Sequence, residues 1–158
     1  MAEAKGRLTR IALEGVSLHR LSALQEADRD QAVADLQAEN AFYPTAHPDL
    51  QSIVHLSIRD GRLIFDIRDE TDAPVLAVGL AMSPFKMLLK DYQMLLDSYA
   101  HAIAEGREAK IQAIDMGRRG LHNEGATLMA ARLEGKVEID FPTARRLFTL
   151  VCALHQKL

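Results

Sequence analysis

The clearest pattern along the chain is an alternation of apolar and polar residues at 53–68, IVHLSIRDGRLIFDIR. A period of two is typical of a β-strand with one buried face. The dipeptide Asp60-Gly61 divides the segment and suits the type I′ turn of a two-residue hairpin. That turn would place Leu56 opposite Phe65 and gather the apolar residues on one face. The segment therefore predicts an antiparallel hairpin with a buried side.

A third strand is expected directly after this hairpin. Residues 74–81, PVLAVGLA, are continuously apolar, which favours a central place in the sheet. Together with the hairpin they form a predicted meander over 53–81. Weaker apolar patterns predict two further strands, at 7–14 and 136–140.

Apolar residues spaced three and four apart predict the helices. The widest stripe begins at Ser83, an expected N-cap, and should end at Gly106. Another helix should start at Ser22 in a capping box with Gln25, and a last one after the cap residue Asp140. Strands and helices cluster separately along the chain. We therefore expect one α+β domain over 1–158, with a mostly antiparallel sheet and helices packed mainly on one face.

The segment 115–125, DMGRRGLHNEG, interrupts the helical pattern with three glycines. Gly120 fits the position after a helix, and Asn123 fits the N-cap of the next. The segment is therefore expected to be a joint between two helices. Gly117 would lie inside the first of them, at a cost of about 1 kcal/mol relative to alanine. It calls for another reason, such as close packing, a kink or space for a ligand.

Charged side chains of this joint suit an anion site, because guanidinium and imidazole groups beside unpaired helix N–H groups bind anions. A second adjacent arginine pair follows at 145–146. Asp115 is expected to pair with Arg119, four residues on. The candidate ligand-binding residues are Asp115, Arg118, Arg119, His122, Asn123, Arg145 and Arg146.

Three functions fit these residues. The leading hypothesis is a non-enzymatic regulatory or interaction domain that binds an anionic small molecule or an acidic protein surface at 115–125. The alternative is a small enzyme in which His122 and Glu124 form an acid–base pair while Arg118 and Arg119 hold an anionic substrate. A third interpretation is a buried polar network that fixes helix packing. An open pocket favours the first two, whereas arginines paired with carboxylates favour the third.

Two other polar or reactive residues have structural interpretations. The hairpin register places His55 opposite Asp66, and we interpret them as a cross-strand pair because no nucleophile completes a triad. Cys152 is the single cysteine and lies in an apolar run, as a buried small hydrophobe would. One cysteine cannot form the paired-cysteine motifs of zinc sites.

Composition narrows the function classes further. The chain has 22 carboxylates against 19 Lys and Arg, a net charge of −3, which argues against a nucleic-acid partner. It lacks the glycine-rich phosphate loops of nucleotide-binding folds and the HExxH of zinc proteases, so we expect no metal and no cofactor. No apolar run is long enough for a membrane span, and the N-terminus lacks a signal-peptide core. We expect a cytoplasmic protein without a membrane partner, and a homodimer on frequency alone.

Four stretches of the chain resemble a family of small bacterial proteins, the uncharacterised protein family UPF0262. They are His55–Arg68, Ser83–Tyr92, Ala113–Gly125 and Lys136–His155. The resemblance covers nearly the whole chain, and the last two stretches are its most specific part. It implies a bacterial, cytoplasmic, single-domain protein. It implies no particular activity, cofactor or catalytic residue.

Overall fold

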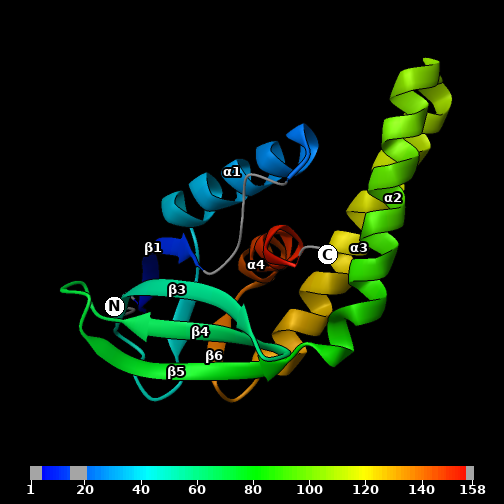
Figure 1. Ribbon diagram of the computed structural model, residues 1–158. Coiled ribbons are helices and arrows are strands. Elements are labelled where there is room, and N and C mark those ends of the chain that lie inside the picture. The colour runs from blue at the N-terminus through cyan, green and yellow to red at the C-terminus, as the bar shows by residue number, and fades with distance from the viewer. Residues whose placement is uncertain (1–4, 15–20, 156–158) are drawn as a thin grey trace.

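The computed structural model describes residues 5–14 and 21–155. Within them the strands form a four-stranded sheet and a small two-stranded sheet, accompanied by α-helices (Figure 1). The expected α+β class is confirmed. In chain order the elements are β1 (Arg7–Leu13), α1 (Ala23–Ala38), β2 (Phe42–Pro44), β3 (Gln51–Arg59), β4 (Arg62–Arg68), β5 (Pro74–Ala81), a short 3-10 helix (Ser83–Phe85), α2 (Lys86–Glu105), α3 (Glu108–Leu133), β6 (Val137–Ile139) and α4 (Phe141–Leu154).

The predicted meander is confirmed as β3, β4 and β5, which pair antiparallel in that order. Leu56 lies opposite Phe65, as the alternation predicts, and both side chains are fully buried. Asp60 and Gly61 have φ of 50° and 72°, the two positive values that a type I′ turn requires. The dipeptide therefore sets the register of the sheet.

The outer strands of the sheet depart from expectation in two ways. The strand order is β1-β3-β4-β5, so β5 is an edge strand and its predicted central place is wrong. Val78 and Leu80 are buried, but Ala77 on the other face is exposed. Small outward residues made the strand look apolar on both faces. At the opposite edge β1 pairs with β3 in parallel, so the sheet is mixed.

The second sheet joins two distant parts of the chain. β6, the strand expected at 136–140, pairs antiparallel with β2, and Phe42 lies opposite Ile139. The apolar alternation of β2 is only three residues long and ends at Pro44, so it gives no strand signal of its own. This pairing positions the start of α4, which follows β6 directly.

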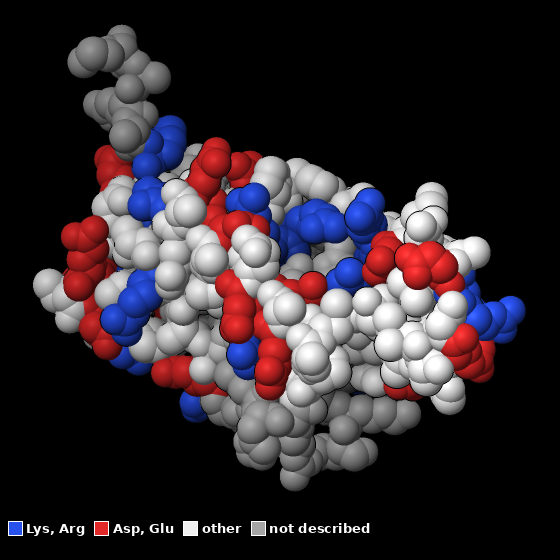
Figure 2. Space-filling view, turned by 90° about the horizontal axis from the view of Figure 1, so that it is seen from above, with Lys and Arg blue, Asp and Glu red and all other residues white. Residues whose placement is uncertain are grey.

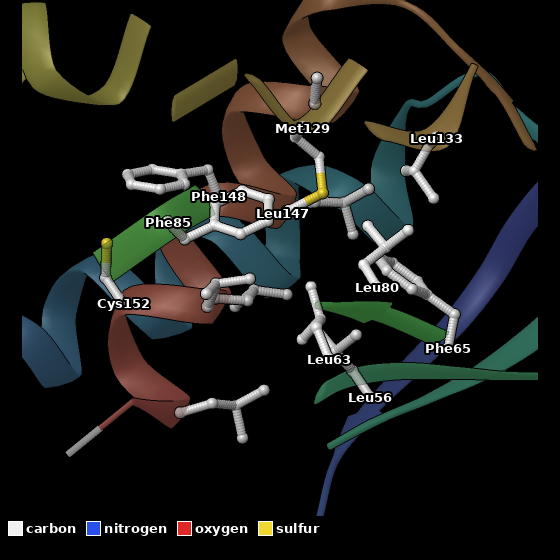
Figure 3. Close-up of a cluster of buried hydrophobic side chains, with 14 of the residues drawn as sticks. Leu56, Leu63, Phe65, Leu80, Phe85, Met129, Leu133, Leu147, Phe148 and Cys152 are labelled. Carbon is white, nitrogen blue, oxygen red and sulfur yellow. The ribbon is translucent and has the colours of Figure 1, made fainter. Parts of the chain in front are cut away.

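The helices lie on one side of the sheet, as predicted (Figure 1). α4 lies over the sheet and beneath α1, and α2 and α3 form a hairpin that rises beside them. Figure 3 shows the core between α4 and the sheet, with Phe148 and Leu147 of α4 on one side and Leu63 and Phe65 of the sheet on the other. All four are fully buried.

The expected helix joint at 115–125 is wrong, because α3 continues through it as one helix of 26 residues. Gly120 therefore ends no helix and Asn123 caps none. Gly125 has a steric reason, because a Cβ there would overlap the ring of Phe148 where α3 packs against α4. Gly117 is exposed, and a Cβ there would make only an ordinary van der Waals contact with Leu95 of α2 at 3.4 Å, so close packing does not require a glycine at this position.

Besides Gly120 and Asn123, the sequence predicts four helix-end residues, and three of these four follow the prediction. Ser22 and Gln25 form the predicted capping box, Asp140 accepts a hydrogen bond from the Thr143 amide, and α2 ends at Gly106. Ser83 is not an N-cap, because the chain first makes a 3-10 turn there. Of the helices that the structure describes, none has both the length and the apolar character of a bilayer span.

Candidate functional site

A pocket of about 310 Å³ lies between α1, α3 and α4 and gathers most of the predicted ligand-binding residues. In Figure 2, Lys and Arg side chains gather at a hollow of the molecular face, with acidic side chains beside them. Each of the three helices contributes one wall. The lining residues are Asp28, Gln31, Ala32 and Asp35 of α1, Arg118, Arg119 and His122 of α3, and Arg145, Arg146 and Thr149 of α4.

Arg118 is held by two carboxylates. Its Nη1 donates a short hydrogen bond to Asp28 of α1, and its Nη2 donates to Asp115 Oδ1 at 3.2 Å. The expected pair of Asp115 with Arg119 is therefore wrong, because Arg118 points toward α1 and takes the carboxylate. These ion pairs tie α1 to α3, which gives Arg118 a structural role at the edge of the pocket.

The other three arginines of the pocket have no carboxylate partner among the described residues. Arg145 donates from Nε to Asn123 Oδ1 at 3.0 Å, and Arg146 donates from Nη1 to the Glu39 carbonyl oxygen at 3.2 Å. Both acceptors are neutral. Burial, and then the positive charges of Arg118 and Arg119, lower the pKa of Arg145. The pocket therefore concentrates positive charge that the described chain does not neutralise.

His122 of α3 also lines the pocket and is only 4% exposed. Its ring contacts Tyr92 and Phe148 edge-on, at centroid distances of 5.5 and 5.8 Å. Nδ1 lies 2.8 Å from the Arg118 carbonyl oxygen, which only accepts, so Nδ1 carries the proton. Burial lowers the pKa of His122, so the imidazole is neutral at pH 7. Nε2 is then an acceptor.

Glu124 does not reach this pocket. Residues two apart on a helix point about 200° apart, and Glu124 lies on the far side of α3 from His122. There it lines a separate groove against α2, together with Leu95, Gly117 and Gly120. The expected acid–base pair of His122 and Glu124 is therefore not formed.

Residues 5–157 match the model of an uncharacterised protein family, UPF0262. The chain belongs to the UPF0262 family. A UPF0262 protein of Acidiphilium cryptum is 62% identical over 156 residues, which is 99% of this chain and 96% of the relative. One from Granulibacter bethesdensis is 58% identical over 98% of this chain and 93% of the relative, and one from Xanthobacter autotrophicus is 44% identical over 99% and 96%. No solved structure matches. The resemblance seen in the sequence is confirmed, and the family name assigns no activity.

Two of the predicted residues of this UPF0262 chain lie beside the pocket instead of lining it. Asp115 holds Arg118, and Asn123 holds Arg145, so both position arginines. The wall from α1 was not predicted: Asp28 lies ninety residues before Arg118, which it binds, and Asp35 lies on the same helix. On a helix with many surface carboxylates, only the contact across the fold distinguishes these two.

A second charged cluster of the UPF0262 fold lies on the outer face of the sheet, and we call it the His55 cluster: Glu14, His55, Asp66, Arg68 and Asp72. His55 Nδ1 is 2.8 Å from Glu14 Oε2, and Nε2 is 2.9 Å from Asp72 Oδ1. Asp66 lies opposite His55 in register, as predicted, but its carboxylate accepts from Arg68 at 2.8 Å instead. The expected His55–Asp66 contact is therefore wrong.

The two carboxylates of the His55 cluster fix the protonation of the imidazole. Both ring nitrogens face a carboxylate oxygen, and this geometry favours the imidazolium form, in which both nitrogens donate. The hydrogen bond with Asp72 opposes burial, and with help from Glu14 it raises the pKa of His55. Arg68 also binds Asp72, at 3.1 Å. Every cation of this cluster thus has a carboxylate partner.

Metal and thiol chemistry find no support in the described residues. No group of three or more His, Cys, Asp or Glu side chains within 5–14 and 21–155 is arranged to hold a metal ion. Cys152 is buried in the core, as predicted, and burial raises the pKa of its thiol well above the usual range. A protonated core thiol is a poor nucleophile.

Proposed function

We propose that the pocket between α1, α3 and α4 binds an anionic small molecule, and that the protein is a non-enzymatic binding or regulatory domain of the bacterial cytoplasm. One observation carries the proposal. Arg119, Arg145 and Arg146 converge on one pocket without a carboxylate partner among the described residues. A bound anion would neutralise charges that now repel one another.

The shape of the site favours a small molecule over an acidic protein surface. The pocket is concave, and its volume of about 310 Å³ falls at the lower end of the range of small-ligand sites. An acidic protein surface would need cations spread over a broad, flat patch. Three helices that meet around one hollow instead surround a ligand of limited size.

Pairing with carboxylates accounts for only one of the four arginines of the pocket. A network that fixes helix packing would neutralise its buried charges, because an unpaired charge in a protein interior is costly. Arg118 meets that expectation with Asp28 and Asp115. Arg145 is partly buried and has only the neutral Asn123 as its side-chain partner.

The proposed chemistry is binding without turnover. The enzyme alternative needs an acid–base pair, and Glu124 faces another groove. Of the remaining pocket groups, Asp28 is committed to Arg118, and the Thr149 hydroxyl donates to the Arg145 carbonyl oxygen at 3.1 Å. His122 offers one acceptor nitrogen and Asp35 one free carboxylate oxygen, and neither is hydrogen-bonded to a hydroxyl or thiol among the described residues. This set binds and orients a ligand but lacks a nucleophile with its base.

The proposal is tested by thermal denaturation in a chloride buffer with added phosphate, pyrophosphate or citrate. The wild-type protein should gain stability with one or more of these anions, in proportion to occupancy. Arg145→Gln should lose that gain. Arg132→Gln, an exposed α3 position away from the pocket, removes the same charge and should keep it. Equal gains in all three proteins, or no gain with any anion, would contradict an anion site here.

A further inference from the structure

We infer that the ligand of this pocket is a phosphomonoester with a hydroxyl-bearing body, held by its phosphate on the arginines of α3 and α4 and by its hydroxyl groups on α1. The inference rests on the proposed anion-binding function and specifies the ligand. It follows from a difference between the walls of the pocket: one presents guanidinium donors, and the other presents oxygen acceptors.

The charge of the pocket matches a dianion. Four arginines and two aspartates line it, so with His122 neutral the lining carries a net charge of +2. A phosphomonoester carries about −1.5 to −2 at pH 7. A monocarboxylate would leave part of the positive charge uncompensated. Guanidinium groups also bind phosphate oxygens in a bidentate manner, which gives the arginine wall a geometric preference for phosphate.

The α1 wall is unsuited to a second anionic group. Asp35 lines the pocket there, and Gln31 Nε2 donates to Asp35 Oδ1 at 2.8 Å. This bond occupies Oδ1 and one amide proton, and it leaves Asp35 Oδ2 and Gln31 Oε1 with no hydrogen bond from the described residues. Both oxygens are acceptors, and one is charged. They would repel a second phosphate but accept hydrogen bonds from hydroxyl groups.

His122 of α3 adds a third acceptor to the pocket lining. Its Nδ1–H is committed to the Arg118 carbonyl oxygen, so Nε2 offers only a lone pair. The neutral ring contributes no charge to the phosphate end, and it is buried against Phe148, which restricts its rotation. A hydroxyl group on the ligand would satisfy this nitrogen, whereas a fully ionised phosphate oxygen would not.

Calorimetric titration of the wild-type protein tests the ligand class with defined probes. Ribose 5-phosphate, glucose 6-phosphate and glycerol 3-phosphate carry the hydroxylated body, methyl phosphate carries the phosphate alone, and ribose carries the body alone. At least one of the three phosphomonoesters should bind about tenfold tighter than methyl phosphate, the effect of one hydrogen bond to a charged group. Ribose should show no binding in the same concentration range.

Asp35→Ala separates the two walls. It should weaken the best phosphomonoester about tenfold and leave methyl phosphate unchanged or slightly tighter, because a carboxylate is removed. Asp30→Ala is the matched control, an exposed carboxylate on α1 that does not line the pocket, and should change neither affinity.

Two other outcomes would contradict the ligand class alone or both proposals. If methyl phosphate binds as tightly as all three phosphomonoesters and Asp35→Ala changes nothing, the ligand class is wrong and the anion site stands. If no phosphate compound and none of the other anions binds, both proposals fail.

Discussion

The pocket and the His55 cluster contain similar charged side chains, but they differ in how many of their cations are paired with carboxylates. In the His55 cluster, Arg68 binds Asp66 and Asp72, and His55 binds Glu14 and Asp72. In the pocket, only Arg118 has carboxylate partners among the described residues. Charge density by itself therefore does not identify a functional site. The informative feature is charge that the fold brings together and leaves uncompensated, and of these two regions the pocket has it.

The histidines of the two regions follow the same division. His55 sits between two carboxylates that favour its charged form, and its pKa is raised, chiefly by the hydrogen bond with Asp72. His122 sits between two aromatic rings, and burial lowers its pKa. One is a cation that joins strands and loops on the sheet. The other is a neutral acceptor at the pocket.

The largest loss of stability is expected on replacing Arg118, the arginine of the pocket that is paired with carboxylates. Arg118→Ala removes both ion pairs and leaves Asp28, whose side chain is 23% exposed, without its partner. We expect a loss of about 2 kcal/mol in the free energy of unfolding, measured by urea denaturation. A loss below about 0.5 kcal/mol, the usual range for surface positions, would contradict a structural role for Arg118.

The second largest loss of stability is expected in the His55 cluster, where the cations are paired. His55→Gln cannot donate to Glu14 and Asp72 in the same geometry, and the imidazole is 8% exposed. We expect a loss of about 1–2 kcal/mol in the free energy of unfolding at pH 6. His47→Gln, at an exposed position, is the matched control and should change little. Equal stability of the two variants would show that the His55 cluster contributes nothing.

The pH dependence of stability should have opposite signs at the two histidines. The folded pKa of His55 lies above 6.5, so its contribution is complete below pH 6.5 and is lost as pH rises through that raised pKa. The folded pKa of His122 lies below 6.5, so its contribution is present above pH 6.5 and is lost as pH falls through that lowered pKa. NMR titration of the imidazole signals measures both directions. His155, whose pKa burial also lowers, is distinguished by a His155→Gln variant.

The smallest effect on stability is expected at Arg119, the neighbour of Arg118 in the chain. Arg119 is exposed, and no ion pair is found for it among the described residues, so Arg119→Ala should change the free energy of unfolding by less than about 0.5 kcal/mol. The same variant should reduce the stabilisation by phosphate or pyrophosphate. Adjacent arginines would then separate into one structural and one ligand-binding residue. A loss of stability like that of Arg118→Ala would remove this distinction.

Local chemistry predicted the parts of the fold that depend on neighbouring residues. Asp60-Gly61 fixes its hairpin because both residues tolerate positive φ, and Ser22 with Gln25 caps α1 by contacts three residues apart. The same chemistry misled at Gly120 and Asn123, which suit helix ends. There the apolar face of α3 packs against neighbouring helices, and this tertiary burial outweighs the local preference for a break.

The candidate site was predictable only where its residues stand out locally in the sequence. Two adjacent arginine pairs, one on α3 and one on α4, stand out in the sequence, and all four of these arginines line the pocket. Asp28 and Asp35 do not stand out, because their role arises from the position of α1 over α4. Pairing of Arg118 with α1 could not be seen in the sequence either, since its partner lies ninety positions away.

The most direct test is a crystal of the protein grown without phosphate or sulfate and soaked in tungstate, a tetrahedral dianion whose anomalous signal marks its position. The uncompensated charge of the pocket predicts one strong peak within hydrogen-bonding distance of guanidinium groups from Arg119, Arg145 or Arg146. It predicts none at Arg68 in the His55 cluster, where carboxylates already occupy the guanidinium group. An empty pocket, or a peak at Arg68 instead, would contradict the anion site.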